Sequence, residues 1–419
     1  MRIEELRKKI ADYDFSALYK NAGEARGRYL VALSEYESLF GDGDVMLLSV
    51  PGRSELLGNH TDHNGGKVLA GAIDKDVIAV VSKTDDGVMT LKSEGYPTES
   101  IATADISYKD KFENFTSASL IAGVADGIVK LGGNIGGYRA YITSDVPKGS
   151  GISSSAAYEV MIGNILNHLY NGGEIANTEI AKISQYAENV YFGKPSGLMD
   201  QMACAVGGFV YIDFADKKNP IIKPIGFSLD KAGYELCIVN TGGNHADLND
   251  DYASVPAEMR AVAATLGKEI LSGIPEDEII ANACKIRESC GDRALLRAIH
   301  FVRENERVES GAAALNAEDI DAFFREVIAS GRSSFEYLQN VYTNKNVTEQ
   351  GLSLALALTE GMSNSVGAFR VHGGGFAGTI QAYVKRDAVD EYVRLMDGVF
   401  AKGSVMRLTV RPVGAIRVI

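Results

Sequence analysis

The chain has no tryptophan, nine prolines and four cysteines in its 419 residues. It also lacks any apolar run of the roughly eighteen residues that a membrane-spanning helix requires. The first ten residues, MRIEELRKKI, are charged and amphipathic, without the apolar segment of a secretory signal. We therefore expect a cytoplasmic protein that does not bind a membrane.

The few cysteines exclude a cysteine-based scaffold. None forms a C-x-x-C pair, and the one close pair lies on a predicted helix, which argues against a structural zinc site or a disulfide framework. We predict buried, reduced thiols at Cys204, Cys237, Cys284 and Cys290.

The chain also has fewer positively charged than negatively charged residues. The chain has 42 lysines and arginines against 55 aspartates and glutamates, which gives a formal net charge of −13. Nonspecific nucleic-acid binding needs a basic surface, so this class of partner is excluded. With 46% apolar residues, a chain of this length can bury a large core and is expected to form two domains.

Glycine, in contrast, is abundant, and three glycine-rich segments stand out. The most informative is VPKGSGISSSAAYE at residues 146–159, where glycines and three hydroxyls precede a strongly helical sequence. Such a loop aims successive backbone N–H groups at one spot, and the helix adds its positive end, so the segment suits a polyphosphate. An ordinary serine N-cap is the alternative, which the loop alone does not exclude. The expected phosphate contacts are Lys148, Gly149, Ser150, Gly151, Ser153, Ser154, Ser155 and Ala156.

The second segment, PGRSELLGNHTDHNGG at residues 51–66, lies between two predicted strands, Val45–Val50 and Val77–Val81. It gathers a guanidinium, carboxylates, amides and two imidazoles between glycines, a density of polar groups that suits the hydroxyls of a sugar. A solvated loop is the alternative, and the apolar strands on both sides weigh against it.

The third segment, VHGGGFAG at residues 371–378, matches the G-x-G-x-x-G pattern of dinucleotide sites. That pattern requires a following helix, whereas residues 379–384 continue as a strand. No P-loop occurs either, because Lys67, Lys194 and Lys268, which each follow a glycine, precede Val, Pro and Glu. Dinucleotide-binding and Walker-type folds are therefore excluded.

In this order and spacing, the three segments resemble the motifs of the GHMP small-molecule kinases, and the first is similar to that of galactokinases. The galactokinase pattern reads GRxNLIGEHTDYNGG. The segment GLMDQ at residues 197–201 also matches the family. This chain keeps Gly52, Arg53, Leu56, Gly58, His60, Thr61, Asp62, Asn64, Gly65 and Gly66.

The resemblance implies an α+β, two-domain GHMP kinase fold. A ribosomal-protein-S5-like domain would cover residues 1–215 and a ferredoxin-like domain residues 216–419, with the active site between them. It implies a sugar 1-kinase that uses ATP and Mg²⁺ to convert galactose to galactose 1-phosphate. We expect the sugar and ATP as partners, neither nucleic acid nor a membrane, and a monomer.

The resemblance also assigns roles to residues. Asp200 would accept the proton of the anomeric hydroxyl or hold it in line, and Arg53 would keep that carboxylate ionised and offset phosphoryl charge. An exposed salt bridge is the alternative for this pair. Ser155 and Glu188 would hold Mg²⁺ with the nucleotide phosphates, although by itself Glu188 reads as a solvated helix residue.

The sugar pocket implied by the resemblance comprises Asn59, His60, Asp62, Gly197 and Tyr252. The chain departs from the family at Asn59, where the pattern has glutamate, and also at His63 and Ser196. An amide can still bond a hydroxyl but lacks the charge of a carboxylate. The sugar therefore stays open between galactose and N-acetylgalactosamine, galacturonate or arabinose. A non-catalytic galactose sensor is the other class, disfavoured by the retained catalytic residues.

Periodicity and turn residues locate the main elements. Helices are predicted over Arg28–Phe40, Ala156–Tyr170 and Asn177–Gly193, and strands over Gly207–Phe214, Tyr234–Asn240, Ala368–Val371, Thr379–Lys385 and Val405–Val410.

Overall fold

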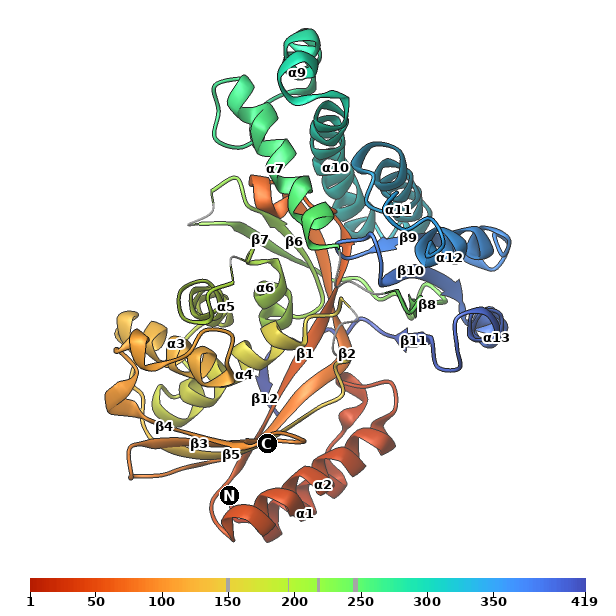
Figure 1. Ribbon diagram of the computed structural model, residues 1–419. Helices are drawn as coiled ribbons and strands as arrows, with labels where there is room; N and C mark the ends of the chain where they lie inside the picture. The colour runs from red at the N-terminus through yellow and green to blue at the C-terminus, as the bar shows by residue number, and fades with distance from the viewer. Residues whose placement is uncertain (148–150, 195, 217–218, 244–247) are drawn as a thin grey trace.

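The computed structural model describes residues 1–147, 151–194, 196–216, 219–243 and 248–419. Within these ranges, one sheet has eight strands and a second has four. Figure 1 shows two long strands of the first sheet, β1 (Met46–Leu57) and β2 (Lys67–Lys83), crossing the middle of the molecule, with the second sheet beside them.

The first sheet has the order β12-β1-β2-β5-β3-β4, and β6 and β7 extend it from β2. Its pairs are antiparallel, except that β3 runs parallel to β5. The remaining strands are β3 (Val88–Ser93), β4 (Thr98–Ala102), β5 (Tyr138–Ser144), β6 (Phe209–Asp213), β7 (Ile221–Ile225) and β12 (Ile416–Arg417).

Strand β1 is longer than predicted, because it continues past Val50 to Leu57. Its register with β2 shifts between Pro51 and Arg53, and again between Glu55 and Leu57. An irregularity of this kind tolerates a proline, which has no N–H to donate to the ladder. The second glycine-rich segment therefore begins inside the sheet and is held rigidly there.

Alternate residues of β1 serve two different cores, as the two-residue period of a strand requires. Leu47 packs with helices α1 (Ile3–Asp12) and α2 (Ala22–Phe40), whereas Leu48 belongs to the large core on the opposite face. In Figure 1 the two N-terminal helices lie on one side of the sheet and four others on the opposite side. These four are α3 (Ser117–Lys130), α4 (Ser154–Tyr170), α5 (Asn177–Tyr186) and α6 (Met199–Val206).

The second sheet is antiparallel, with the order β11-β8-β10-β9. Its strands are β8 (Tyr234–Asn240), β9 (Val366–His372), β10 (Thr379–Lys385) and β11 (Val405–Leu408), and helices α12 (Gly351–Glu360) and α13 (Val389–Val399) share one core with it. The large core includes its Tyr383 together with Phe323 of α11 (Ile320–Ser333). The other C-terminal helices are α7 (Asn249–Thr265), α8 (Glu276–Ala281), α9 (Ala283–Cys290), α10 (Asp292–Asn316) and α11 (Ile320–Ser333).

The C-terminal residues return to the first sheet. Strand β12 pairs with β1, and the fully buried Arg411 forms an ion pair with Asp76 of β2, at 3.2 Å. The division into residues 1–215 and 216–419 stays a prediction, although β7 and β12 of the second part lie in the first sheet. The mixture of helices with mainly antiparallel sheets agrees with the predicted α+β class.

Several sequence predictions can be compared directly. Strands β8 and β10 have the predicted bounds, and α4 begins only two residues before its predicted start. The cysteines are free, and Cys204 and Cys237 are buried as predicted. The expectation of burial is wrong for Cys284, which is exposed, and for Cys290, which is only partly buried, because Ile286 is the one buried residue of α9. Among the described helices, none combines the length and apolar character needed to span a membrane.

Candidate active site

Arg53 and Asp200, which are 147 positions apart, form a close ion pair. The side chain of Arg53 extends from β1 and donates through Nε and Nη2 to Oδ1 of Asp200, at 2.8 and 2.6 Å. Asp200 lies in the first turn of α6, and its Oδ2 accepts a hydrogen bond from the hydroxyl of Ser153. Arg53 is buried, so this pair is not the exposed salt bridge considered as its alternative.

The surroundings keep the carboxyl of Asp200 ionised. Burial alone would raise the pKa of Asp200, but the charge of Arg53 and the hydroxyl of Ser153 outweigh burial and hold that pKa below its usual value. The site therefore contains a fixed carboxylate and a fixed guanidinium in contact at neutral pH. This is an arrangement that can orient a hydroxyl and compensate phosphoryl charge.

The loop that precedes α4 lies against this pair. Arg53 also donates through Nη1 to the carbonyl of Gly151, and both Gly151 and Ser153 have positive φ angles. Ser153 holds the N-cap position without capping, because its hydroxyl is used by Asp200. Ser153 therefore contacts the site instead of capping the helix, and the alternative of an ordinary serine N-cap is disfavoured.

The remaining predicted phosphate contacts divide into two groups. Ser154, Ser155 and Ala156 form the first turn of α4, whose N–H groups have no partner within the helix. The positive end of this 17-residue helix suits an anion. Lys148, Gly149 and Ser150 lie outside the described residues.

Glu188 is not the solvated residue that its helix position suggested. It is buried in a π-helical turn, Ala187–Phe192, that follows α5. Its Oε1 accepts from Lys194 Nζ at 2.7 Å, and its Oε2 accepts from Ser196 Oγ at 2.6 Å and Gln201 Nε2 at 2.8 Å. Lys194 was missed by the sequence analysis, which considered its Gly-Lys pair only as a fragment of a P-loop.

A pocket of about 190 Å³ opens beside Asp200. It brings together every predicted catalytic and sugar-binding residue, and also Glu188 from the predicted metal pair. Its lining comprises Arg53, Glu55, Asn59, His60, Asp62, His63, Glu188, Lys194, Ser196, Gly197, Met199, Asp200, Tyr252, Gly373 and Gly374.

The wall of this pocket is closely packed. The Nε2 of His60 lies 2.9 Å from the carbonyl oxygen of Gly374, and its ring lies 5.1 Å from that of Tyr252, centroid to centroid. Burial lowers the pKa of His60 to about 3, so the ring is neutral and donates through Nε2. A Cβ on Gly197 would lie 2.3 Å from Oδ2 of Asp62, so a glycine is needed for this approach.

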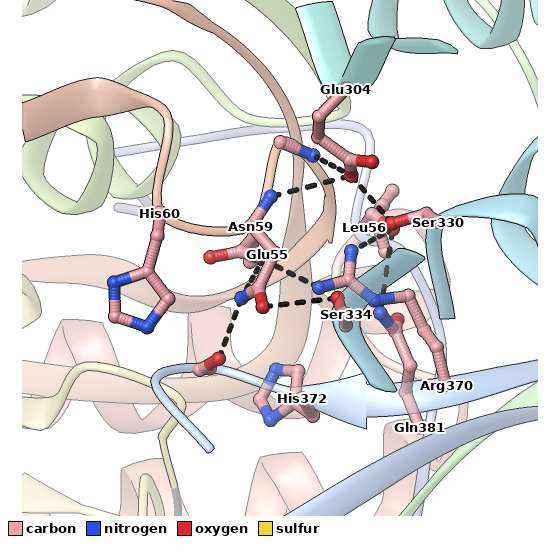
Figure 2. A network of polar contacts seen from close by, with 12 residues as sticks. Glu55, Leu56, Asn59, His60, Glu304, Ser330, Ser334, Arg370, His372 and Gln381 are labelled. Atoms are coloured by element: carbon pink, nitrogen blue, oxygen red, sulfur yellow. Dashed lines mark hydrogen bonds and ion pairs between the residues drawn. The ribbon is translucent and has the colours of Figure 1, made fainter. Parts of the chain in front are cut away.

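Asn59 faces the pocket but is held by the protein (Figure 2). Its Nδ2 donates to Glu55 Oε1 at 3.1 Å and to the carbonyl of Gly373 at 2.7 Å. Its Oδ1 accepts from Asn340 Nδ2 at 2.7 Å and from Ser334 Oγ at 3.3 Å. Position 59 itself carries no charge, but the carboxyl group of Glu55 lies directly beside it.

Helix α10 holds the turn that carries Asn59 through hydrogen bonds. Glu304 is fully buried, and its Oε1 accepts from the backbone N–H groups of Gly58 and Asn59, at 3.1 and 3.4 Å. The ring of His300 contacts the carbonyl of Asn59 through Nε2 at 3.0 Å. No sequence signal marked these residues, which lie more than 240 positions from the turn.

His372 supports the fold behind the site. It is buried between Ser54 and Thr379, with ring nitrogens 3.1 and 2.9 Å from their hydroxyls. Across the part of the chain that the structure describes, no three His, Cys, Asp or Glu residues cluster as a metal site. A magnesium ion would therefore depend on nucleotide oxygens for most of its ligands.

Known proteins share this architecture. The structure of Lactococcus lactis galactokinase complexed with galactose aligns with a TM-score of 0.78 at 24% identity, covering 93% of this chain and all of that one. A mevalonate kinase structure aligns with a TM-score of 0.60 at 15% identity, over 87% of this chain and 98% of that one. The GHMP kinases N terminal domain matches residues 119–208, which include the loop before α4 and Asp200. Fold and site together define a GHMP small-molecule kinase.

More specific matches narrow the class. The galactokinase galactose-binding signature covers residues 34–83. The galactokinase of Streptomyces coelicolor is 32% identical over 375 residues, which cover 87% of this chain and 91% of that relative. The galactokinase of Clostridium tetani is 29% identical over a similar range. The chain belongs to the galactokinase family, as its three glycine-rich segments predicted, and it is a sugar kinase.

Proposed function

We propose that the protein transfers the γ-phosphoryl group of ATP to the anomeric hydroxyl of galactose, giving galactose 1-phosphate and ADP. The observation that carries this proposal is the contact between Arg53, Asp200 and Ser153. It joins the phosphate loop to the wall of a pocket with the polar lining that a sugar needs. Relatives named galactokinase over most of the chain supply the identity of the sugar.

The transfer follows from this contact. Asp200 accepts a hydrogen bond from the anomeric hydroxyl, whose oxygen attacks the γ-phosphorus as the bond to the β–γ bridging oxygen breaks. The hydroxyl proton passes to Asp200, which returns it to solvent because its pKa is low. Arg53 offsets the charge of the transferring group, and Asp200 both holds the hydroxyl in line and accepts its proton.

The chemistry of the two predicted ligands suits Mg²⁺. Glu188 offers a buried carboxylate at the pocket and Ser155 an exposed hydroxyl in the first turn of α4, and both are the hard oxygen ligands that Mg²⁺ prefers. When bound, the ion would neutralise phosphate charge.

The sugar would occupy the side of the pocket formed by His60, Asp62, Gly197 and Tyr252. Neutral His60, with Nε2 committed to Gly374, offers Nδ1 as an acceptor for a sugar hydroxyl. The carboxylates of Glu55 and Asp62 also line the pocket and make it less suitable for a uronic acid. We further propose that the enzyme acts as a cytoplasmic monomer.

The test is ADP release with ATP and Mg²⁺ across galactose, 2-deoxygalactose, N-acetylgalactosamine, galacturonate, arabinose and glucose. Asp200→Asn serves as the inactive control, and ³¹P NMR identifies the phosphorylated position. We expect galactose to be preferred, with phosphate on the anomeric oxygen. Preference for another sugar would overturn the substrate, and sugar binding without turnover would support the sensor instead.

A further inference from the structure

One carboxylate in the pocket has hydrogen-bonding capacity that the protein does not use. Glu55 projects from the end of β1, and its Oε1 accepts from Asn59 Nδ2 at 3.1 Å and Arg370 Nη2 at 3.0 Å (Figure 2). Among the described residues, none donates to its Oε2. Glu55 lines the pocket, and its Oε2 is not fully buried, so this oxygen is accessible from the pocket.

The orientation of Glu55 is fixed from behind. Arg370 is fully buried in β9, where its Nη1 also donates to the carbonyl of Leu56 at 3.1 Å. The ion pair and the amide of Asn59 both engage Oε1, which leaves Oε2 as the oxygen presented to a ligand. A carboxylate held in this way is preorganised to accept a hydrogen bond from a hydroxyl group.

The side chain of Asn59 has no free hydrogen-bonding group for a ligand. Both of its N–H bonds and its carbonyl oxygen already have protein partners, and the residue is 1% exposed. Breaking one of these contacts to bind a sugar would leave a buried polar group unpaired, which is unfavourable. A ligand hydroxyl would therefore be bound more favourably by Glu55.

The galactokinase pattern given above has asparagine where this chain has Glu55, and glutamate where it has Asn59. The chain thus has the amide and the carboxylate exchanged within one contacting pair. We propose that Glu55 Oε2 is the acceptor that selects the sugar by one of its hydroxyls, and that Asn59 is its positioning residue. The ligand is a neutral sugar with a hydroxyl at that position. The proposal rests on the pocket being the sugar site of the proposed function.

The decisive variant is Glu55→Gln, which keeps the shape and removes the charged acceptor. Binding of galactose and of its 2-, 3-, 4- and 6-deoxy analogues is measured by calorimetry, and kcat/KM by ADP release. In the wild type, one deoxy analogue should bind about 10- to 100-fold more weakly than galactose, the value of a charged hydrogen bond. In the variant, this one ratio should shrink by about tenfold while the others stay the same.

A matched control separates selection from general damage. Glu235→Gln removes another buried carboxylate that is paired with an arginine, Arg407, but lies outside the pocket. It should leave all the ratios unchanged. A uniform loss over all sugars in Glu55→Gln, or unchanged ratios, would overturn the role of Glu55.

The exchange can also be reversed. Asn59→Glu places two carboxylates side by side and should weaken galactose binding at least tenfold. The double variant Glu55→Asn with Asn59→Glu should recover most of that loss, and a folded double variant without recovery would overturn the exchange. Since binding is measured apart from turnover, a wild type that binds galactose without phosphorylating it would refute the kinase but not the role of Glu55. A wild type that binds no sugar would overturn both.

Discussion

Replacing Asp200 by asparagine should abolish most of the activity without changing the shape of the site. The amide oxygen can still accept from Arg53, which now donates to Oδ1 at 2.6 and 2.8 Å. What disappears is the negative charge that receives the anomeric proton. A positioned proton acceptor contributes about 10²- to 10⁴-fold to a rate, so kcat should fall by this factor. This corresponds to about 3–5 kcal/mol at 1.36 kcal/mol for each tenfold change.

The loss should lie in kcat, because Asp200 contributes more to the transition state than to ground-state binding. The assay is ADP release at saturating galactose and ATP, with galactose affinity measured by calorimetry. Since the pKa of Asp200 is already below its usual value, wild type and variant should differ by the same factor at pH 6 and pH 8. Asp76→Asn is the control, since it neutralises a fully buried, ion-paired aspartate away from the pocket.

The control should lower the free energy of unfolding but leave kcat of the folded protein unchanged. An Asp200→Asn enzyme that keeps more than a tenth of wild-type kcat would refute the reasoning. Proton acceptance and charge at this position would then be dispensable, and the pair with Arg53 would be structural.

Three further outcomes are expected. Glu188→Gln should raise the Mg²⁺ concentration for half-maximal rate at least tenfold, because a neutral amide is a weaker magnesium ligand; a metal titration of the rate that does not shift would contradict the assignment. Gly197→Ala should raise KM for the sugar about tenfold with little change in the urea midpoint, because its Cβ displaces the carboxylate of Asp62; an unchanged KM would show that this approach is unimportant. Burial lowers the pKa of both His60 and His372 to about 3, so unfolded chains bind more protons below pH 6.5. Lowering the pH from 7 to 5.5 should therefore reduce the free energy of unfolding by about 2.5 kcal/mol through these two residues. Urea titrations of the double Gln variant should lack this part of the loss, and a double variant with the full wild-type loss would contradict the assignment.

Local patterns predicted the elements whose ends are set by local chemistry. Strand β10 and helix α4 follow clear periodicity, and α4 ends at Tyr170 as predicted. Strand β1 was predicted too short, because a proline usually ends a strand. Here Pro51 stands at a register shift that only the partner strand β2 reveals.

For the site, the glycine-rich segments identified the pocket, and resemblance selected most of its predicted lining residues. The residues that hold the pocket wall in place were not predicted, because they lie on α10 and β9, far away in the sequence. Glu304 and Arg370 contact β1 and the turn after it across about 250 to 315 positions of sequence. Glu55 was not predicted for a different reason. Asn59 was identified as a difference from the galactokinase pattern, but the matching difference at Glu55, four residues earlier, was not considered with it.

The return of β12 to the first sheet affects how the protein can be made. Strand β1 lacks its neighbour on one edge, and Asp76 lacks Arg411, until residues near position 417 are available. The first sheet therefore cannot reach its final hydrogen bonding while the ribosome is still adding the second sheet. The N-terminal part of the sheet is completed only when the C-terminal residues have been synthesised. Folding intermediates during synthesis should therefore expose the edge of β1 to chaperones.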